Sequence, residues 1–224
     1  MAIAVNDIVA NVRDVLLDTD SDNYRWSSDE LIGFLNEGSK MVVINKSDAN
    51  TVFATVQLSS GTEQDLPTGG IQLIDVVCNM GTTGTTPGRT CPIVDKRKID
   101  TSTPTWHSDT AAIVVKNVVY DKNQKNKFYV YPQSNGTNYI RIVHSAIPTI
   151  VSAGDNIVIS DVYETALFDW ILFRAFLKDS DISPSAAQRA SFHLSSFSTA
   201  VGAQMKAEDI NDGYKEITDD GDLN

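Results

Sequence analysis

The feature that most constrains this fold is a helix-length segment, residues 162–177, that is apolar on nearly every side. Twelve of its 16 residues are apolar, and Asp161 before it can cap a helix. A helix that is apolar all round must be covered on more than one side. The segment contains Glu164, Asp169 and Arg174 and is shorter than the ~20 residues that a bilayer requires, which argues against a membrane span. It therefore predicts a buried helix, covered either entirely within the chain or partly by a neighbouring subunit.

Three further segments carry helix signals. Residues 6–17 place apolar side chains at helical spacing. Residues 27–46 begin with a capping box, in which Ser27 accepts a hydrogen bond from the amide of Glu30 and the Glu30 side chain reaches back. A Ser-Pro pair at 183–184 is typical of the cap and first position of a last helix. The first two helices are expected to form an antiparallel pair.

The middle of the chain has the pattern of β-strands. Residues 51–58 alternate, and one side carries Val52, Ala54, Val56 and Leu58. A Gly/Thr-rich segment at 81–88 predicts a flexible loop. Further strands are predicted at 62–66, 71–78, 113–120, 127–131 and 139–147.

Two helices before the β region and two after it suggest an economical α+β architecture. We expect a four-helix bundle with a β-rich insertion between the second and third helices. The expected parts are an N-terminal helical pair, the insertion, a C-terminal helical pair and an acidic flexible tail, at residues 1–50, 51–159, 160–207 and 208–224.

Charge disfavours one class of protein, and the start of the chain and its cysteines indicate where the chain folds. The formal net charge is -11, and residues 208–224 hold seven acidic residues against one lysine, a net charge of -6. A general binder of the phosphate backbone needs basic patches, which this balance disfavours. The start of the chain has no basic segment or cleavage site of a signal peptide, so the chain is expected to fold in a cytoplasm. There, Cys78 and Cys91 are expected to be reduced thiols.

One segment superficially resembles a calcium-binding loop. Residues 18–23 read DTDSDN, but an EF-hand needs glycine at its sixth position and glutamate at its twelfth. Those positions hold Asn23 and Asp29. The sequence therefore predicts a polar structural loop, not a metal site.

The motifs of enzymes are also missing from the sequence. The three histidines have no second ligand at metal-binding spacing, and no Gly-x-Ser-x-Gly elbow occurs. The loop at 81–88 lacks the Lys-Ser/Thr that a P-loop needs. We therefore expect no catalytic residue, no metal and no cofactor. An enzyme would need convergent carboxylates or a metal in a pocket.

Four segments, taken in order, resemble a family of tailed-bacteriophage head-to-tail adaptor proteins. Residues 24–38 (YRWSSDELIGFLNEG) are similar to its N-terminal signature, and residues 66–77 (LPTGGIQLIDVV) to the strand after its first hairpin. Residues 128–132 (FYVYP) are similar to a later strand. Residues 161–179, which include DVYETAL and RAFLKD, resemble the family's third helix. The resemblance extends over residues 6–205.

The resemblance implies a structural virion protein and no catalytic residues. Such proteins form a ring, commonly twelvefold, that docks under the portal, extends the DNA channel without sequence-specific binding and offers a surface to the tail tube or nozzle. The implied location is the head-tail junction of a virion assembled in the host cytoplasm, with no membrane contact. The alternative is another tail or baseplate connector, which would bind tail proteins but not the portal.

Within that interpretation, two sets of residues become candidates for contacts. The aromatic side chains of the apolar helix are candidates for the subunit interface, namely Phe168, Trp170, Phe173 and Phe176. The acidic tail fits a segment that orders on binding the portal, and its candidates are Glu208, Asp209, Tyr214 and Lys215.

Overall fold

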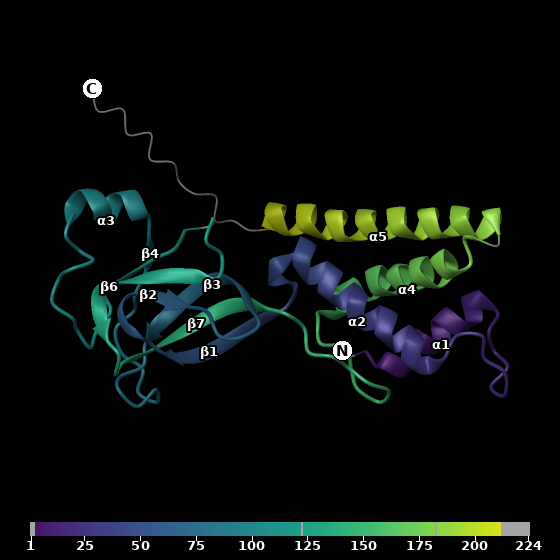
Figure 1. Ribbon diagram of the computed structural model, residues 1–224, viewed down its shortest axis with the longest axis horizontal. Helices are drawn as coiled ribbons and strands as arrows, with labels where there is room; N and C mark the ends of the chain where they lie inside the picture. The colour runs from purple at the N-terminus through teal and green to yellow at the C-terminus, as the bar shows by residue number, and fades with distance from the viewer. Residues whose placement is uncertain (1–2, 122, 182, 212–224) are drawn as a thin grey trace, which may run out of the picture. The chain divides into compact units, whose positions relative to one another are not determined.

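The chain folds into two compact units, drawn in the computed structural model of Figure 1. The structure describes the backbone of residues 3–121, 123–181 and 183–211, and side chains of these as far as residue 202. A helical unit contains residues 1–46 and 150–224, and a β unit contains residues 47–149.

The helical unit is built from α1 (Val5–Leu16), α2 (Ser28–Asn45), α4 (Glu164–Lys178) and α5 (Pro184–Asn211). The predicted capping box is present, because the Ser27 hydroxyl accepts from the Glu30 amide at 3.2 Å. Leu17 ends α1 in the left-handed conformation, with φ of 55°. A 3₁₀ turn, Asp161–Tyr163, precedes α4, which therefore begins two residues later than predicted.

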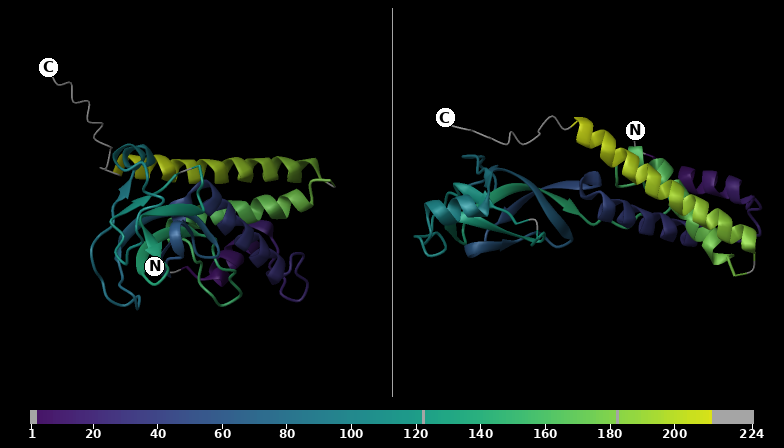
Figure 2. Two further views of the ribbon diagram at one scale, coloured as in Figure 1. Left: turned by 60° about the vertical axis from the view of Figure 1, so that its left-hand side comes forward. Right: turned by 90° about the horizontal axis from the view of Figure 1, so that it is seen from above.

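The α+β class is correct, but the prediction of a four-helix bundle is wrong. The described residues form five helices and two sheets, and the fifth helix, α3 (Lys96–Ser102), belongs to the β unit. Within the helical unit α4 is the central element and packs on α1, α2 and α5. Figure 2 shows α5 running along α4. The helix α4 is apolar on nearly every side, and it lies at the centre of its unit because three other helices cover its different sides.

A glycine brings α2 close to this central helix. A Cβ atom built on Gly38 would lie 2.9 Å from Cδ1 of Trp170. Real Cβ contacts are not that short, so the indole ring occupies the space that a side chain at position 38 would need. The close approach therefore depends on glycine, which has no Cβ.

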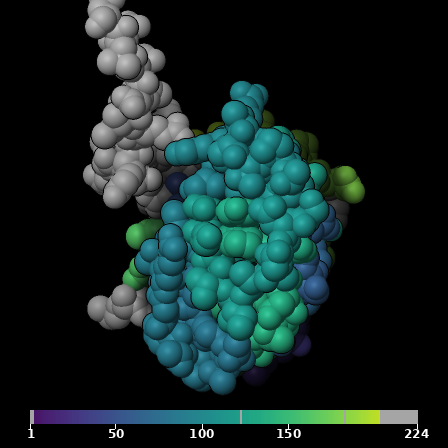
Figure 3. Space-filling view, turned by 90° about the vertical axis from the view of Figure 1, so that its left-hand side faces the viewer, coloured from purple at the N-terminus to yellow at the C-terminus, as the bar shows by residue number. Residues whose placement is uncertain are grey.

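The β unit contains two sheets, with strand orders β1-β7-β3 and β2-β6-β5-β4. Figure 3 shows one face of this unit. The buried core includes Leu73, Phe128, Val130, Ile140 and Ile142. The strands are β1 (Thr51–Gln57), β2 (Ser60–Asp65), β3 (Gly70–Asn79), β4 (Ile93–Val94), β5 (Asn117–Val119), β6 (Lys127–Asn135) and β7 (Tyr139–Ala146).

The predicted alternation of the first strand is largely confirmed. Ala54 and Val56 pack partly buried against the core, and Leu58 is buried beside them. Val52 points to the same side but remains 38% exposed at the start of the strand. Along β1, every residue from Thr51 to Gln57 pairs with β7 without a bulge.

One predicted strand is only partly formed. Residues 113–120 were expected to be extended throughout, but β5 covers only Asn117–Val119. The buried Asn79 side chain explains the difference, because its amide pairs with both polar groups of Val115. Asn79 Oδ1 accepts from the Val115 amide at 2.8 Å, and Nδ2 donates to the Val115 carbonyl at 2.9 Å. A side chain thus replaces a strand neighbour at this position.

Both cysteines are free, as expected, and both are buried. Burial is the main cause that raises the pKa of the Cys91 thiol to about 11, and the nearby Cys78 and Asp75 raise it further. Below that pH the thiol is protonated, and the protonated form is a poor nucleophile.

We therefore expect Cys91 to resist alkylation by iodoacetamide at pH 8 in the folded chain. Its labelling should be about a hundredfold slower or more than in guanidinium, where the thiol regains an ordinary pKa and access to solvent. Peptide mass spectrometry after timed quenching measures both rates. Rapid labelling of Cys91 in the folded chain would contradict this assignment.

Candidate interface surfaces of the helical unit

The structure divides the four aromatic side chains predicted for the subunit interface. Trp170 and Phe176 are buried inside the chain. The Trp170 ring centroid lies 4.9 Å from that of Phe197 on α5, and the Phe176 ring stacks on His193 at 5.7 Å. Phe168 and Phe173 are only half-buried. Trp170 and Phe176 therefore serve the α4–α5 contact, and Phe168 and Phe173 retain exposed surface.

A polar contact that the sequence analysis missed holds α5 on α4. Asp169 is 6% exposed, and its carboxylate lies 2.8 Å from Nδ1 of His193. The Ser196 hydroxyl donates to the other oxygen of the same carboxylate at 2.5 Å. In a hydrolytic triad the histidine would accept the serine proton. Here both groups bind the carboxylate instead, which makes the arrangement a structural anchor.

The sequence indicated that Asp169 would be buried, but it did not identify the residues that bind its carboxylate. Asp169 is an acidic residue in the middle of the most apolar segment of the chain, and His193 falls on the inner stripe of α5 with Ala190 and Phe197. A buried acid requires hydrogen-bond donors, but the sequence alone does not say which helix supplies them.

Replacing Asp169 with alanine should lower the free energy of unfolding by about 1.5–3 kcal/mol, because two hydrogen bonds to a carboxylate are lost and His193 and Ser196 lose their partner. Urea unfolding followed by circular dichroism measures the change. Ser198→Ala is the matched control, because the Ser198 hydroxyl donates only to a carbonyl of its own helix on an exposed face. Equal stability of the two variants would show that the anchor is unimportant.

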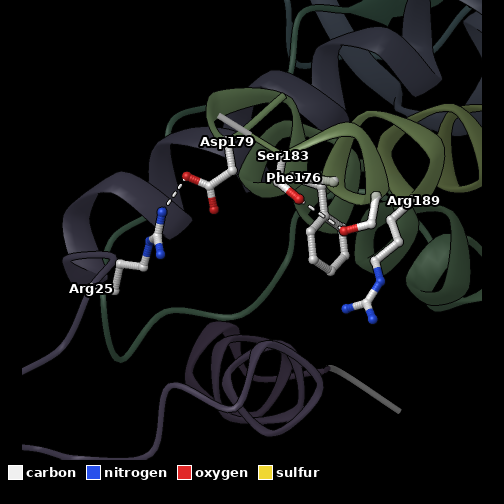
Figure 4. A pocket seen from close by; sticks show the side chains of 7 residues that line it. Arg25, Phe176, Asp179, Ser183 and Arg189 are labelled. Carbon is white, nitrogen blue, oxygen red and sulfur yellow. Dashed lines mark hydrogen bonds and ion pairs between the residues drawn. The ribbon is translucent and has the colours of Figure 1, made fainter. Parts of the chain in front are cut away.

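Three of the hollows on the described surface of the helical unit are lined partly by residues of α4. The first, of about 300 Å³, lies where α4 connects to α5 (Figure 4). Arg25 forms an ion pair with Asp179 at its rim. The Arg189 guanidinium lies 5.5 Å from the centroid of the Phe176 ring, and the Ser183 hydroxyl bonds that of Ser185. Two of the charged groups of this hollow, Arg25 and Asp179, therefore pair with each other, and the third, Arg189, lies against an aromatic ring.

The second hollow, of about 330 Å³, lies between α2 and α4. Lys178 pairs with Glu30 at 2.6 Å across it. Arg174 pairs with Glu37 at 3.1 Å, and its guanidinium lies 5.3 Å from the centroid of the Phe34 ring. Ion pairs therefore bridge this hollow as well.

The third hollow, between α1 and α4, has a different character. It measures about 380 Å³ and is lined by Ile8 and Asn11 of α1 and by Glu164, Thr165 and Phe168 of α4. The half-buried ring of Phe168 and the side chain of Ile8 give it an apolar wall. We refer to it below as the α1–α4 hollow.

The residues predicted to dock on the portal are beyond what the structure describes. The backbone of α5 is described as far as Asn211, but nothing is described of the side chains of Glu208 and Asp209. Tyr214 and Lys215 lie outside the described residues altogether.

The described residues offer no grouping for metal binding and no membrane span. Within them, no three His, Cys, Asp or Glu side chains lie together so that they could hold a metal ion. No described helix combines the length and the apolar character needed to cross a bilayer.

Comparison with known protein families gives a match. The model of the SU10 adaptor protein family matches residues 3–216. The match includes residues of both the helical unit and the β unit. No curated protein matches the chain.

Proposed function

Because this chain belongs to the SU10 adaptor protein family, a family of phage head-to-tail adaptors, we propose that it is the ring-forming subunit that joins the portal to the tail. About twelve copies form a closed ring under the portal. The ring extends the DNA channel, which the genome crosses without sequence-specific binding, and presents a surface to the tail tube or nozzle. The role is structural, not catalytic, and is carried out at the head-tail junction of the virion.

The observation that carries this proposal is the extent of the family match. It covers residues 3–216, nearly the whole chain, so the likeness includes the units that a ring subunit would use and not only a common helical pair. The surface of the helical unit supports the proposal, because Phe168 and Phe173 keep exposed surface on its central helix. A folded protein that leaves aromatic rings partly uncovered offers anchors for a partner.

Contacts are assigned to two parts of the chain. Phe168 and Phe173 take part in the subunit interface, and Trp170 and Phe176 support them from inside. Glu208, Asp209, Tyr214 and Lys215 dock on the portal. The acidic segment at 208–224, with a net charge of -6, suits a basic patch on that partner.

Deletion of residues 208–224 tests the docking assignment. The shortened chain should bind the cognate portal about tenfold more weakly at low salt, because a segment with net charge -6 is removed. The difference should shrink as salt screens the charges. A matched variant keeps Tyr214 and Lys215 but exchanges the seven acids for their amides. Binding of the deletion variant equal to that of the full chain would refute the assignment.

A further inference from the structure

We infer that neighbouring copies in the ring meet by insertion of Phe192, on α5 of one copy, into the α1–α4 hollow of the next copy. The inference rests on the proposed ring and specifies the two surfaces that would build it. It draws on an exposed aromatic side chain, an apolar hollow and the directions in which the two face.

Phe192 is an exposed aromatic side chain on an otherwise polar helix face. It is 67% exposed and sits on the side of α5 away from the inner stripe of Ala190, Phe197 and Val201. One and two turns away on the same face, the neighbours are the exposed Gln188, Ser195 and Thr199. Small hydroxyl side chains allow a second surface to come close, and aromatic side chains are enriched in the cores of protein interfaces.

The α1–α4 hollow is the one of the three that suits an aromatic guest. Ion pairs border the other two, Arg25 with Asp179 in the first and Lys178 with Glu30 in the second. Burying an apolar ring there would remove charged groups from water. In the α1–α4 hollow, Glu164 is the one charged residue of the described lining, and a guest ring would meet Ile8 and the ring of Phe168 beside the polar Asn11 and Thr165. Its volume of about 380 Å³ is ample for one phenyl group.

Phe192 and the α1–α4 hollow face in different directions, which determines whether Phe192 could fill the hollow of its own chain or of a second copy. Figures 1 and 2 show α5 and α1 on opposite sides of α4. Because Phe192 points away from α4, it cannot reach the hollow of its own chain. A contact between two different faces of identical copies is heterologous, and such contacts build a closed ring when the rotation from one copy to the next closes. A second copy of this chain is therefore the occupant, since one chain carries both the projection and the hollow.

Cysteine cross-linking tests the pairing without removing the phenylalanine. Ser195→Cys lies one turn from Phe192, and Asn11→Cys lies on the wall of the hollow. The buried Cys78 and Cys91 stay in place, with the wild-type chain as the blank. In rings assembled on the cognate portal, mixed single variants should give cross-linked heterodimers under mild oxidation or with a short bismaleimide. The double variant should give a ladder of multimers.

Removal of the Phe192 phenyl group provides the second measurement. Phe192→Ser should reduce ring formation about 30-fold, as expected when a buried aromatic anchor is lost. The helical circular dichroism should remain unchanged, because the side chain is exposed in the single chain. Phe53→Ser is the matched control, since Phe53 of the β unit is 63% exposed and has no part in this contact.

The possible outcomes separate this inference from the function on which it rests. Rings that form on the portal without the cross-links, and that tolerate Phe192→Ser, would overturn the inference and leave the adaptor role intact. Cross-links between two Ser195→Cys chains would overturn it in favour of a symmetric dimer. Cross-links of these sites to a tail protein would overturn it in favour of that partner. If wild-type chains never assemble on the portal, both the inference and the proposed function fail.

Discussion

Replacement of Arg13 with methionine should lower the free energy of unfolding by about 3–5 kcal/mol, because it leaves the buried Asp18 without its counter-charge. The two side chains are 7% and 6% exposed, and Nη1 of Arg13 lies 2.6 Å from Oδ2 of Asp18. Nη2 of Arg13 also donates to the Trp26 carbonyl at 2.9 Å, and its guanidinium lies 3.5 Å from the centroid of the Tyr24 ring. The Arg13 side chain thus joins α1 to the loop that leads into α2.

Urea unfolding of the full chain, followed by circular dichroism, measures this effect. Lys178→Met is the matched control, because the Lys178–Glu30 pair has the same 2.6 Å separation but its lysine side chain is 54% exposed. Exposed pairs contribute at most about 1 kcal/mol. If the two variants unfolded at the same urea concentration, the burial of the Arg13–Asp18 pair would have no energetic consequence and the account of this loop would be wrong.

Truncation of Trp170 to alanine should also cost about 3–5 kcal/mol, the usual penalty for removing a large buried ring. Trp170 fills the space that Gly38 leaves on α2, and it contacts Phe173 of its own helix and Phe197 of α5. Its loss would open a cavity at the centre of the helical unit. The expected result is a stability defect in the single chain, seen before any assembly.

The comparison with Phe168→Ala separates a core side chain from an interface side chain. Phe168 is half-buried on the wall of the α1–α4 hollow, so its truncation should cost the single chain less than that of Trp170. Its effect should appear mainly in assembly. The distinction would be refuted if Phe168→Ala destabilised the single chain as much as Trp170→Ala, or if Trp170→Ala left its stability unchanged.

Local chemistry explains why much of the secondary structure was predictable. Ser27 and Glu30 mark the start of α2 with a capping interaction that needs only neighbouring residues. The alternation at 51–58 reports which side of β1 faces the core. For the loop at 18–23, the missing ligand positions argued for a structural role, and in the structure the Asp18 carboxylate binds Arg13 and the Arg25 amide. Each of these signals lies within a short stretch of chain.

The features that could not be predicted depend on which segments meet. The apolar character of α4 showed that it would be covered, but not that α1, α2 and α5 would all pack on it. The Gly38–Trp170 approach joins residues 132 positions apart, and Asn79 meets Val115 across 36 positions. The residues of the candidate interface could not be predicted for the same reason. The exposed Phe192 and the buried Trp170 are both aromatic residues on helices, and only the packing distinguishes an anchor for a partner from part of the core.

The most direct test of the adaptor role is electron microscopy and mass photometry of the full chain mixed with its cognate portal. We expect a closed ring of about twelve copies docked on one pole of the portal, and a particle mass equal to the portal plus that number of 24.5 kDa subunits. A chain that stays monomeric, ignores the portal and binds purified tail parts would contradict the account and identify a tail connector instead.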